Sequence, residues 1–67
     1  MRQAKWIEIE DLIIANEVMA TNGDVLDIYG KHQNGDFMVQ GSRSESRFWV
    51  KKKEIQLLGD EPIPRVG

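Results

Sequence analysis

Cysteine is absent from this chain of 67 residues, and histidine occurs once, at His32. This composition excludes disulfide bridges, thiolate metal sites and His-rich metal centres, and it suits a reducing compartment. No apolar run approaches the roughly 20 residues that a membrane-spanning helix needs. The opening residues, MRQAKW, lack the hydrophobic region of a signal peptide. We therefore expect a soluble cytoplasmic protein with no metal and no other cofactor.

The chain is also too short to hold both a core and a deep substrate cleft. A chain of this length buries only about 60% of its unfolded surface, which leaves room for roughly a dozen core side chains. The sequence contains no phosphate-binding glycine loop, no nucleophile elbow and no zinc-ligand spacing. These observations argue against an enzyme and favour one small binding domain.

Charge is unevenly distributed along the chain, although the net charge is only −2. Acidic residues dominate the first part: Glu8, Glu10, Asp11, Glu17, Asp24 and Asp27, against Arg2 and Lys5. Basic residues dominate a later segment: Arg43, Arg47, Lys51, Lys52 and Lys53, against Glu45. The two regions either neutralise each other or face different partners. The carboxylates at positions 8, 10 and 11 lack the spacing of a calcium loop or a hydrolase pair, so we expect them to be solvated.

Apolar residues alternate with polar ones in several short segments, which predicts β-strands. Asn-Gly pairs at 22–23 and 34–35 predict tight turns. The first turn lies between two strand-like segments, 17–21 and 25–31, so we expect a hairpin there. Residues 11–20 are ambiguous. Asp11 is a suitable cap for a short helix, whereas 17–21 has the pattern of a strand and 12–14 fits either a strand or a single turn.

Short strands, tight turns and the lack of a long helix predict a mainly β fold, a small antiparallel SH3-like or PRC-like barrel of about five strands. We expect a disordered N-terminus over residues 1–5, the barrel over 6–58, and a tail containing Pro62 and Pro64 over 59–67. The predicted core is Val18, Leu26, Ile28, Phe37, Val39, Phe48, Val50, Ile55 and Leu57.

The segment from Glu17 to Leu58 resembles the PRC-barrel-like family, in which short strands and turns precede a strand ending in a Tyr-Val-Pro type sequence. The matching residues are Val18, Asn22-Gly23, Ile28, Phe37-Met38-Val39, Trp49-Val50 and Ile55. The chain departs from the pattern at Asn22, where Asp is usual, at Leu26-Asp27, where an apolar-Gly pair is usual, and at Lys51, where Pro is usual. These departures keep a generic SH3-like barrel as the alternative. The resemblance implies a non-catalytic module that docks onto larger proteins or complexes.

Alternation also predicts a surface for binding a partner. If Phe37, Val39, Phe48 and Val50 fill the core, then Tyr29, Met38 and Trp49 lie on the opposite face with Arg47 nearby. Exposed aromatic residues beside arginine are typical of binding hot spots. We therefore expect this face to bind a protein partner or a second copy of the chain, unless loops or the segment from Trp6 to Ile9 cover it.

The basic residues Arg43, Arg47, Lys51, Lys52 and Lys53 suggest nucleic-acid binding as an alternative. Cationic side chains neutralise phosphates, and neighbouring aromatic rings stack on unpaired bases. The acidic balance of the whole chain argues against this function, because dedicated nucleic-acid domains usually have a basic pI. A solvated charged loop is the simpler interpretation of the same residues.

Overall fold

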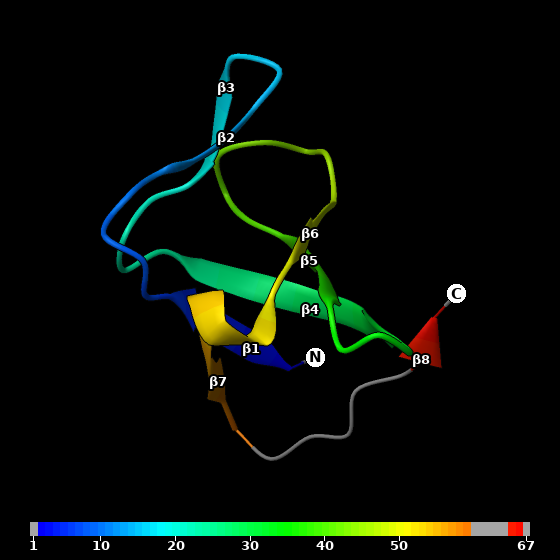
Figure 1. Ribbon diagram of the computed structural model, residues 1–67. Helices are drawn as coiled ribbons and strands as arrows, with labels where there is room; N and C mark the ends of the chain where they lie inside the picture. The colour runs from blue at the N-terminus through cyan, green and yellow to red at the C-terminus, as the bar shows by residue number, and fades with distance from the viewer. Residues whose placement is uncertain (1, 60–64, 67) are drawn as a thin grey trace.

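The computed structural model describes residues 2–59 and 65–66 of the chain. Within them, eight strands and one short 3-10 helix follow in order (Figure 1). The elements are β1 (Gln3–Trp6), β2 (Leu12–Ile14), β3 (Glu17–Ala20), β4 (Val25–His32), β5 (Phe37–Gln40), β6 (Phe48–Val50), η1 (Lys52–Glu54), β7 (Ile55–Leu58) and β8 (Arg65–Val66). The predicted mainly β class is confirmed, with more strands than the five expected. In this part of the chain no helix is long and apolar enough to cross a membrane.

Strand β1 lies inside the main sheet, whose order is β6-β5-β4-β1-β7. It pairs antiparallel with β4 on one side and with β7 on the other, so that Ala4 lies between Leu26 and Leu57. The structure therefore differs from the disordered N-terminus predicted for residues 1–5. The reason is that Ala4 and Trp6 alternate with Gln3 and Lys5, which gives this polar-looking segment one fully buried face.

The sheet wraps around a single core without closing among the described residues. Strands β6 and β7 end the sheet order and are joined along the chain through η1, but they are not paired with each other. The domain is therefore a small antiparallel β-rich fold, and the closed hydrogen-bonded barrel expected from the sequence is not seen. The 3-10 helix covers the end of the run of three lysines, which the sequence predicted as a solvated charged loop.

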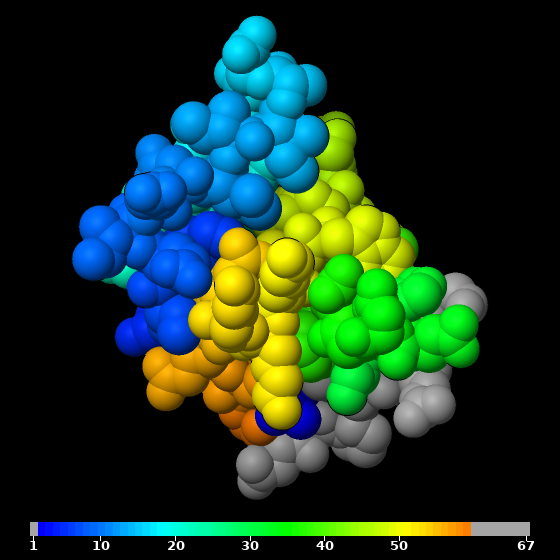
Figure 2. Space-filling view, viewed as in Figure 1, coloured from blue at the N-terminus to red at the C-terminus, as the bar shows by residue number. Residues whose placement is uncertain are grey.

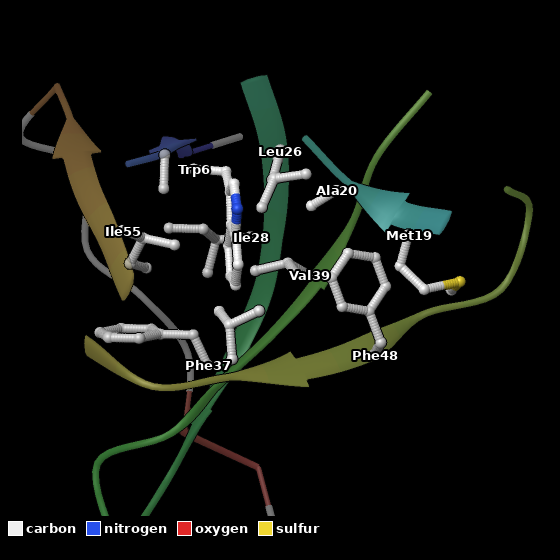
Figure 3. Close-up of a cluster of buried hydrophobic side chains, with 11 residues drawn as sticks. Trp6, Met19, Ala20, Leu26, Ile28, Phe37, Val39, Phe48 and Ile55 are labelled. Carbon is white, nitrogen blue, oxygen red and sulfur yellow. The ribbon is translucent and has the colours of Figure 1, made fainter. Parts of the chain in front are cut away.

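The core contains eleven buried hydrophobic residues, which point into a common interior (Figure 3). Seven of the nine predicted core residues are buried, while Val18 and Leu57 are only partly buried. Trp6, only 2% exposed, is the largest fully buried side chain. The prediction missed Trp6 and Ala4 because it expected residues 1–5 to be disordered and gave the start of the barrel no core residue. It missed Met19 and Ala20 because it took Val18 as the inward residue of the strand over 17–21, whereas Met19 and Ala20 are the buried ones.

The first Asn-Gly pair forms a turn but not the predicted hairpin. The Asp24 amide donates to the Thr21 carbonyl at 2.9 Å, and Gly23 takes the positive φ of 91°. However, the preceding strand β3 pairs with β2, and the following strand β4 pairs with β1 and β5. The turn thus passes the chain from one sheet to another, because both edges of β4 are occupied by other strands.

The second Asn-Gly pair does close a hairpin, between β4 and β5. The Gly35 amide donates to the His32 carbonyl at 2.9 Å, and the Asp36 amide donates to Asn34 Oδ1 at the same distance. Gly35 has φ 99°, a conformation that glycine adopts without steric penalty. The predicted tight turn is confirmed here.

Residues 11–20, ambiguous in sequence, form a two-stranded hairpin, β2–β3, that projects from the body of the molecule (Figure 1). Its turn residues Ala15 and Asn16 both have positive φ, 52° and 64°. This is the two-residue geometry in which both central residues adopt left-handed conformations. Alanine is an unusual choice at such a position, so this turn lacks the Asn-Gly pair that marks the other two.

The predicted tail, residues 59–67, lies mostly outside the described residues, including Pro62 and Pro64. Of the described part, β8 runs parallel to the end of β4, with Arg65 opposite Lys31 and Val66 opposite His32.

Candidate functional site

The outer side of β5 and β6 carries the residues that alternation predicted to face away from the core. In β6, Phe48 and Val50 are buried whereas Trp49 between them is 43% exposed. In β5, Phe37 and Val39 are buried and Met38 is half-buried. Trp49 lies directly opposite Met38 in the register of the two strands. The local geometry of the predicted surface is therefore as the two-residue period requires.

We call these outward residues the aromatic face (Tyr29, Met38, Arg47 and Trp49). The Arg47 guanidinium carbon lies 3.8 Å from the centroid of the Tyr29 ring, a cation–π contact. Met38 and Trp49 are cross-strand neighbours, and methionine is a side chain that adapts well to aromatic surfaces. Two pairs, Arg47 with Tyr29 and Met38 with Trp49, thus connect β6 and the residue before it to β4 and β5.

The aromatic face has a neighbour that the sequence did not indicate, His32. Its ring meets the Trp49 ring edge-to-face, with centroids 5.7 Å apart and planes at 89°. The sequence pattern predicted only the tight turn at 34–35 that follows this residue. A bulge between Ile28 and Gly30 shifts the register of β4 against β5. Simple alternation therefore does not predict which face of the sheet carries the side chains at the end of β4. Figure 2 shows the residues after β4 (green) next to those of β6 (yellow-green to yellow).

The structure separates the five basic residues proposed to bind nucleic acid. Arg43 pairs with Asp24, with Nε 2.6 Å from Oδ2 and a second hydrogen bond from Nη2 to Oδ1 at 3.1 Å. These hydrogen bonds are the main reason that the pKa of Asp24 is lowered, and Asp24 in turn raises the pKa of Arg43. Arg43 thus ties the loop after β5 to the turn before β4, and its charge is already neutralised.

The remaining basic residues lie in different places. Arg47 lies over Tyr29 on the aromatic face, and Lys51, Lys52 and Lys53 are exposed around η1. The Glu54 carboxylate accepts a hydrogen bond from the Lys51 amide at 2.8 Å and so caps this short helix. The five residues therefore do not form one cationic surface with equal access to phosphates.

A cleft of about 580 Å³ lies between η1 and the chain that leaves β1. Sequence reasoning missed it. The chain after β1, which forms one wall of the cleft, has a sequence pattern that predicts either a strand or solvated charge. Residues 7–11 instead form an irregular segment after β1 ends at Trp6. The lining residues are Trp6, Glu8, Ile9, Glu10, Asp11, Leu12, Lys53 and Glu54. We call this site the acidic cleft.

Among residues 2–59 and 65–66, no three His, Cys, Asp or Glu side chains are grouped as metal ligands would be. The carboxylates of the acidic cleft therefore do not form a metal centre. The chain matches no protein-family model, no curated protein and no solved structure.

Proposed function

We propose that this chain is a non-enzymatic binding module, a small barrel-like domain of the SH3-like or PRC-like kind, that docks a protein partner or a second copy of itself through the aromatic face. The exposure of Trp49 carries the proposal. In a chain whose other tryptophan is buried, Trp49 stays 43% exposed beside Met38 and His32. Tryptophan, tyrosine and arginine are the residue types enriched in binding hot spots. The cytoplasm is the location that goes with this proposal, since a chain without cysteine suits a reducing compartment.

The aromatic face is also held in place before any partner arrives. Tyr29 is covered by Arg47, and Trp49 rests against His32, so these side chains have little rotamer freedom left to lose. Ordering flexible side chains is one of the main entropic penalties of association. A stable interface usually covers about 800 Å² on each partner. The accessible surface of this chain is 4527 Å², so a partner would cover roughly a fifth of it.

Replacing Trp49 by alanine tests this proposal. We expect Trp49→Ala to keep the fold, because the indole is not part of the core, and to weaken assembly by tenfold or more, as loss of a hot spot does. Native mass and sedimentation over a range of protein concentrations measure self-association, and comparative pull-down with both proteins measures capture of a partner. Ile13→Ala is the matched control, since Ile13 is 58% exposed on the separate β2–β3 hairpin.

Two results would contradict the proposal. One is equal assembly and equal capture by the Trp49→Ala protein and the unmodified chain. The other is an equal loss with Ile13→Ala, which would indicate nonspecific association of exposed apolar surface rather than docking through this face.

Nucleic-acid binding remains the second candidate because Arg47, Trp49 and Lys51 are all exposed along β6 and its end. A base stacked on Trp49 would have a cation on either side. The pairing of Arg43 with Asp24 removes one charge from that surface. Fluorescence titration with single-stranded oligonucleotides at two salt concentrations discriminates the two functions. Binding that weakens as salt rises supports this candidate, and no binding at low salt dismisses it.

A further inference from the structure

The walls of the acidic cleft are held by hydrogen bonds rather than by a sheet. The Trp6 indole nitrogen donates to the Glu10 carbonyl at 3.0 Å. Asn22 Nδ2 donates to the carbonyls of Ile7 and Glu8, both at 3.1 Å. A further hydrogen bond joins this segment to η1, because the Ile7 amide donates to the Glu54 carbonyl at 3.1 Å. These bonds fix an irregular segment in one conformation, and a fixed cleft binds without a large entropic penalty.

This fixed segment presents an isoleucine to water. Ile9 is 90% exposed and lines the cleft, with the half-buried Leu12 and the edge of the buried Trp6 as its apolar neighbours there. A single exposed apolar residue is common on protein surfaces. Here it lines a cleft together with Leu12 and Trp6, and hydrogen bonds to the carbonyls of Glu8 and Glu10 fix the backbone on either side of it. The arrangement favours contact with an apolar side chain of a ligand.

The charge of the cleft favours a ligand that also carries cationic groups. Four carboxylates line it, against the single ammonium group of Lys53. Two of the four are partly engaged: Glu54 caps η1, and Asp11 contributes to stabilising the charge of Arg43. The side chains of Glu8 and Glu10 accept no hydrogen bond from any described residue. They therefore remain available to cationic groups.

We propose that the acidic cleft binds a short basic peptide segment of a partner protein. Arginine or lysine side chains of the peptide meet Glu8 and Glu10, and an apolar side chain between them packs on Ile9 and Leu12. The cleft shares no lining residue with the aromatic face.

The two indole N–H signals in a proton–nitrogen NMR spectrum report the two surfaces separately. The Trp6 indole N–H donates a hydrogen bond to the Glu10 carbonyl in the wall of the cleft, whereas the Trp49 indole belongs to the aromatic face. Trp49→Ala assigns them, since one signal remains. The probe is a short amidated peptide of alternating arginine and leucine, with a matched peptide containing uncharged citrulline in place of arginine. We expect the arginine peptide to shift the Trp6 indole and the amides of residues 8–11 and 53–54, and the citrulline peptide to shift them far less.

Charge variants give effects of opposite sign, which a purely structural role would not. Glu8→Gln with Glu10→Gln should weaken binding of the arginine peptide about three- to tenfold, as the loss of two exposed ion pairs implies. Lys53→Gln should strengthen it by about twofold, because the repulsive group is removed. Glu45→Gln, a change at an exposed carboxylate outside the cleft, should leave the affinity unchanged.

Three outcomes would overturn the proposal: shifts at the Trp49 indole instead of the Trp6 indole, equal binding of the citrulline peptide, or an unchanged affinity after both glutamates are replaced. None of these outcomes bears on assembly through Trp49, which is measured without the peptide.

Discussion

The two tryptophans of this chain have opposite environments, although their chemistry is the same. Trp6 is in the core and its indole nitrogen is satisfied by a backbone carbonyl, as a buried indole requires. Trp49 is flanked by two buried residues and points outward. One step along a strand reverses the direction of a side chain. Its position in the strand therefore decides whether a tryptophan stabilises the fold or is available for binding.

At the same scale, Ala15 has the least suitable backbone conformation among the described residues. Its φ of 52° lies in the left-handed region, which disfavours side chains with a Cβ atom. We expect Ala15→Gly to raise the free energy of unfolding by about 0.5–1 kcal/mol. The variant relieves the strain at this φ, but part of the gain is lost because glycine gives up more backbone entropy on folding. Urea denaturation followed by fluorescence measures the change.

Asn16→Ala provides the reverse comparison, because it places alanine at φ 64° next to the first one. Asparagine tolerates this region better than alanine, so this variant should be less stable than the unmodified chain. A stability that is unchanged or lower in Ala15→Gly would show that the turn does not adopt this conformation.

At the scale of elements, β1 matters more than its composition suggests. Four residues provide hydrogen-bonding partners to both β4 and β7, and without them the sheet order would be broken in its middle. Trp6 then fills the centre of the core (Figure 3). The N-terminal strand is thus an integral part of the domain.

A charged residue on the buried side of β1 tests this role. Ala4 is fully buried, so Ala4→Glu places a carboxylate among apolar side chains. We expect a loss of at least about 3 kcal/mol, enough to unfold a domain of this size. Lys5→Glu, on the exposed side of the same strand, should change stability by less than about 0.5 kcal/mol. Circular dichroism with urea denaturation compares them. Equal stability of both variants would indicate a frayed N-terminus.

Irregular segments are positioned by side chains that the sequence marks only as turn formers. Asn22 belongs to an Asn-Gly turn, yet its side-chain amide binds two carbonyls of the segment after β1. The residue thereby links the turn before β4 to the wall of the acidic cleft. The Asn-Gly pair by itself predicts the turn, but it does not predict the hydrogen bonds from the Asn22 side chain to the segment after β1.

At the scale of the whole molecule, the acidic part and the basic segment meet at one ion pair, Asp24–Arg43. The contact joins residues 19 positions apart and connects the turn before β4 to the loop after β5. The other charges remain divided between surfaces, with carboxylates around the cleft and lysines around η1. The fold thus neutralises only part of the charge asymmetry seen in the sequence.

This ion pair predicts how stability depends on pH. The hydrogen bond from Arg43 lowers the pKa of Asp24 in the folded state, so the folded protein binds that proton less readily than the unfolded chain. The stabilisation is complete above the unfolded value of about 3.9 and is lost as the pH falls below it through the folded pKa. Asp24→Asn should therefore lower the urea midpoint at pH 7, and its difference from the unmodified chain should vanish in stronger acid.

Glu45→Gln is the control for this measurement, since the exposed Glu45 carboxylate makes no hydrogen bond or ion pair with any described residue. Its urea midpoint should stay close to that of the unmodified chain from neutral pH to acid. A difference between Asp24→Asn and the unmodified chain that persists unchanged at low pH would contradict the role of the ion pair.

The sequence by itself determined the mainly β class, the positions of both Asn-Gly turns and most of the core. It also determined the outward direction of Trp49. Each of these depends on residues within a few positions of one another, such as Phe48 and Val50 on either side of Trp49, and a period of two is readable locally.

Only the tertiary structure decided which strands pair, that β1 is internal, and that residues 8–12 meet η1 to form the acidic cleft. It also brought His32 to Trp49 and Arg43 to Asp24. These features join segments far apart in the chain, and their formation depends on which surfaces become buried together. No local pattern encodes that choice, because Ala4 and Trp6 acquire a buried face only when β4 and β7 pack on both sides of them.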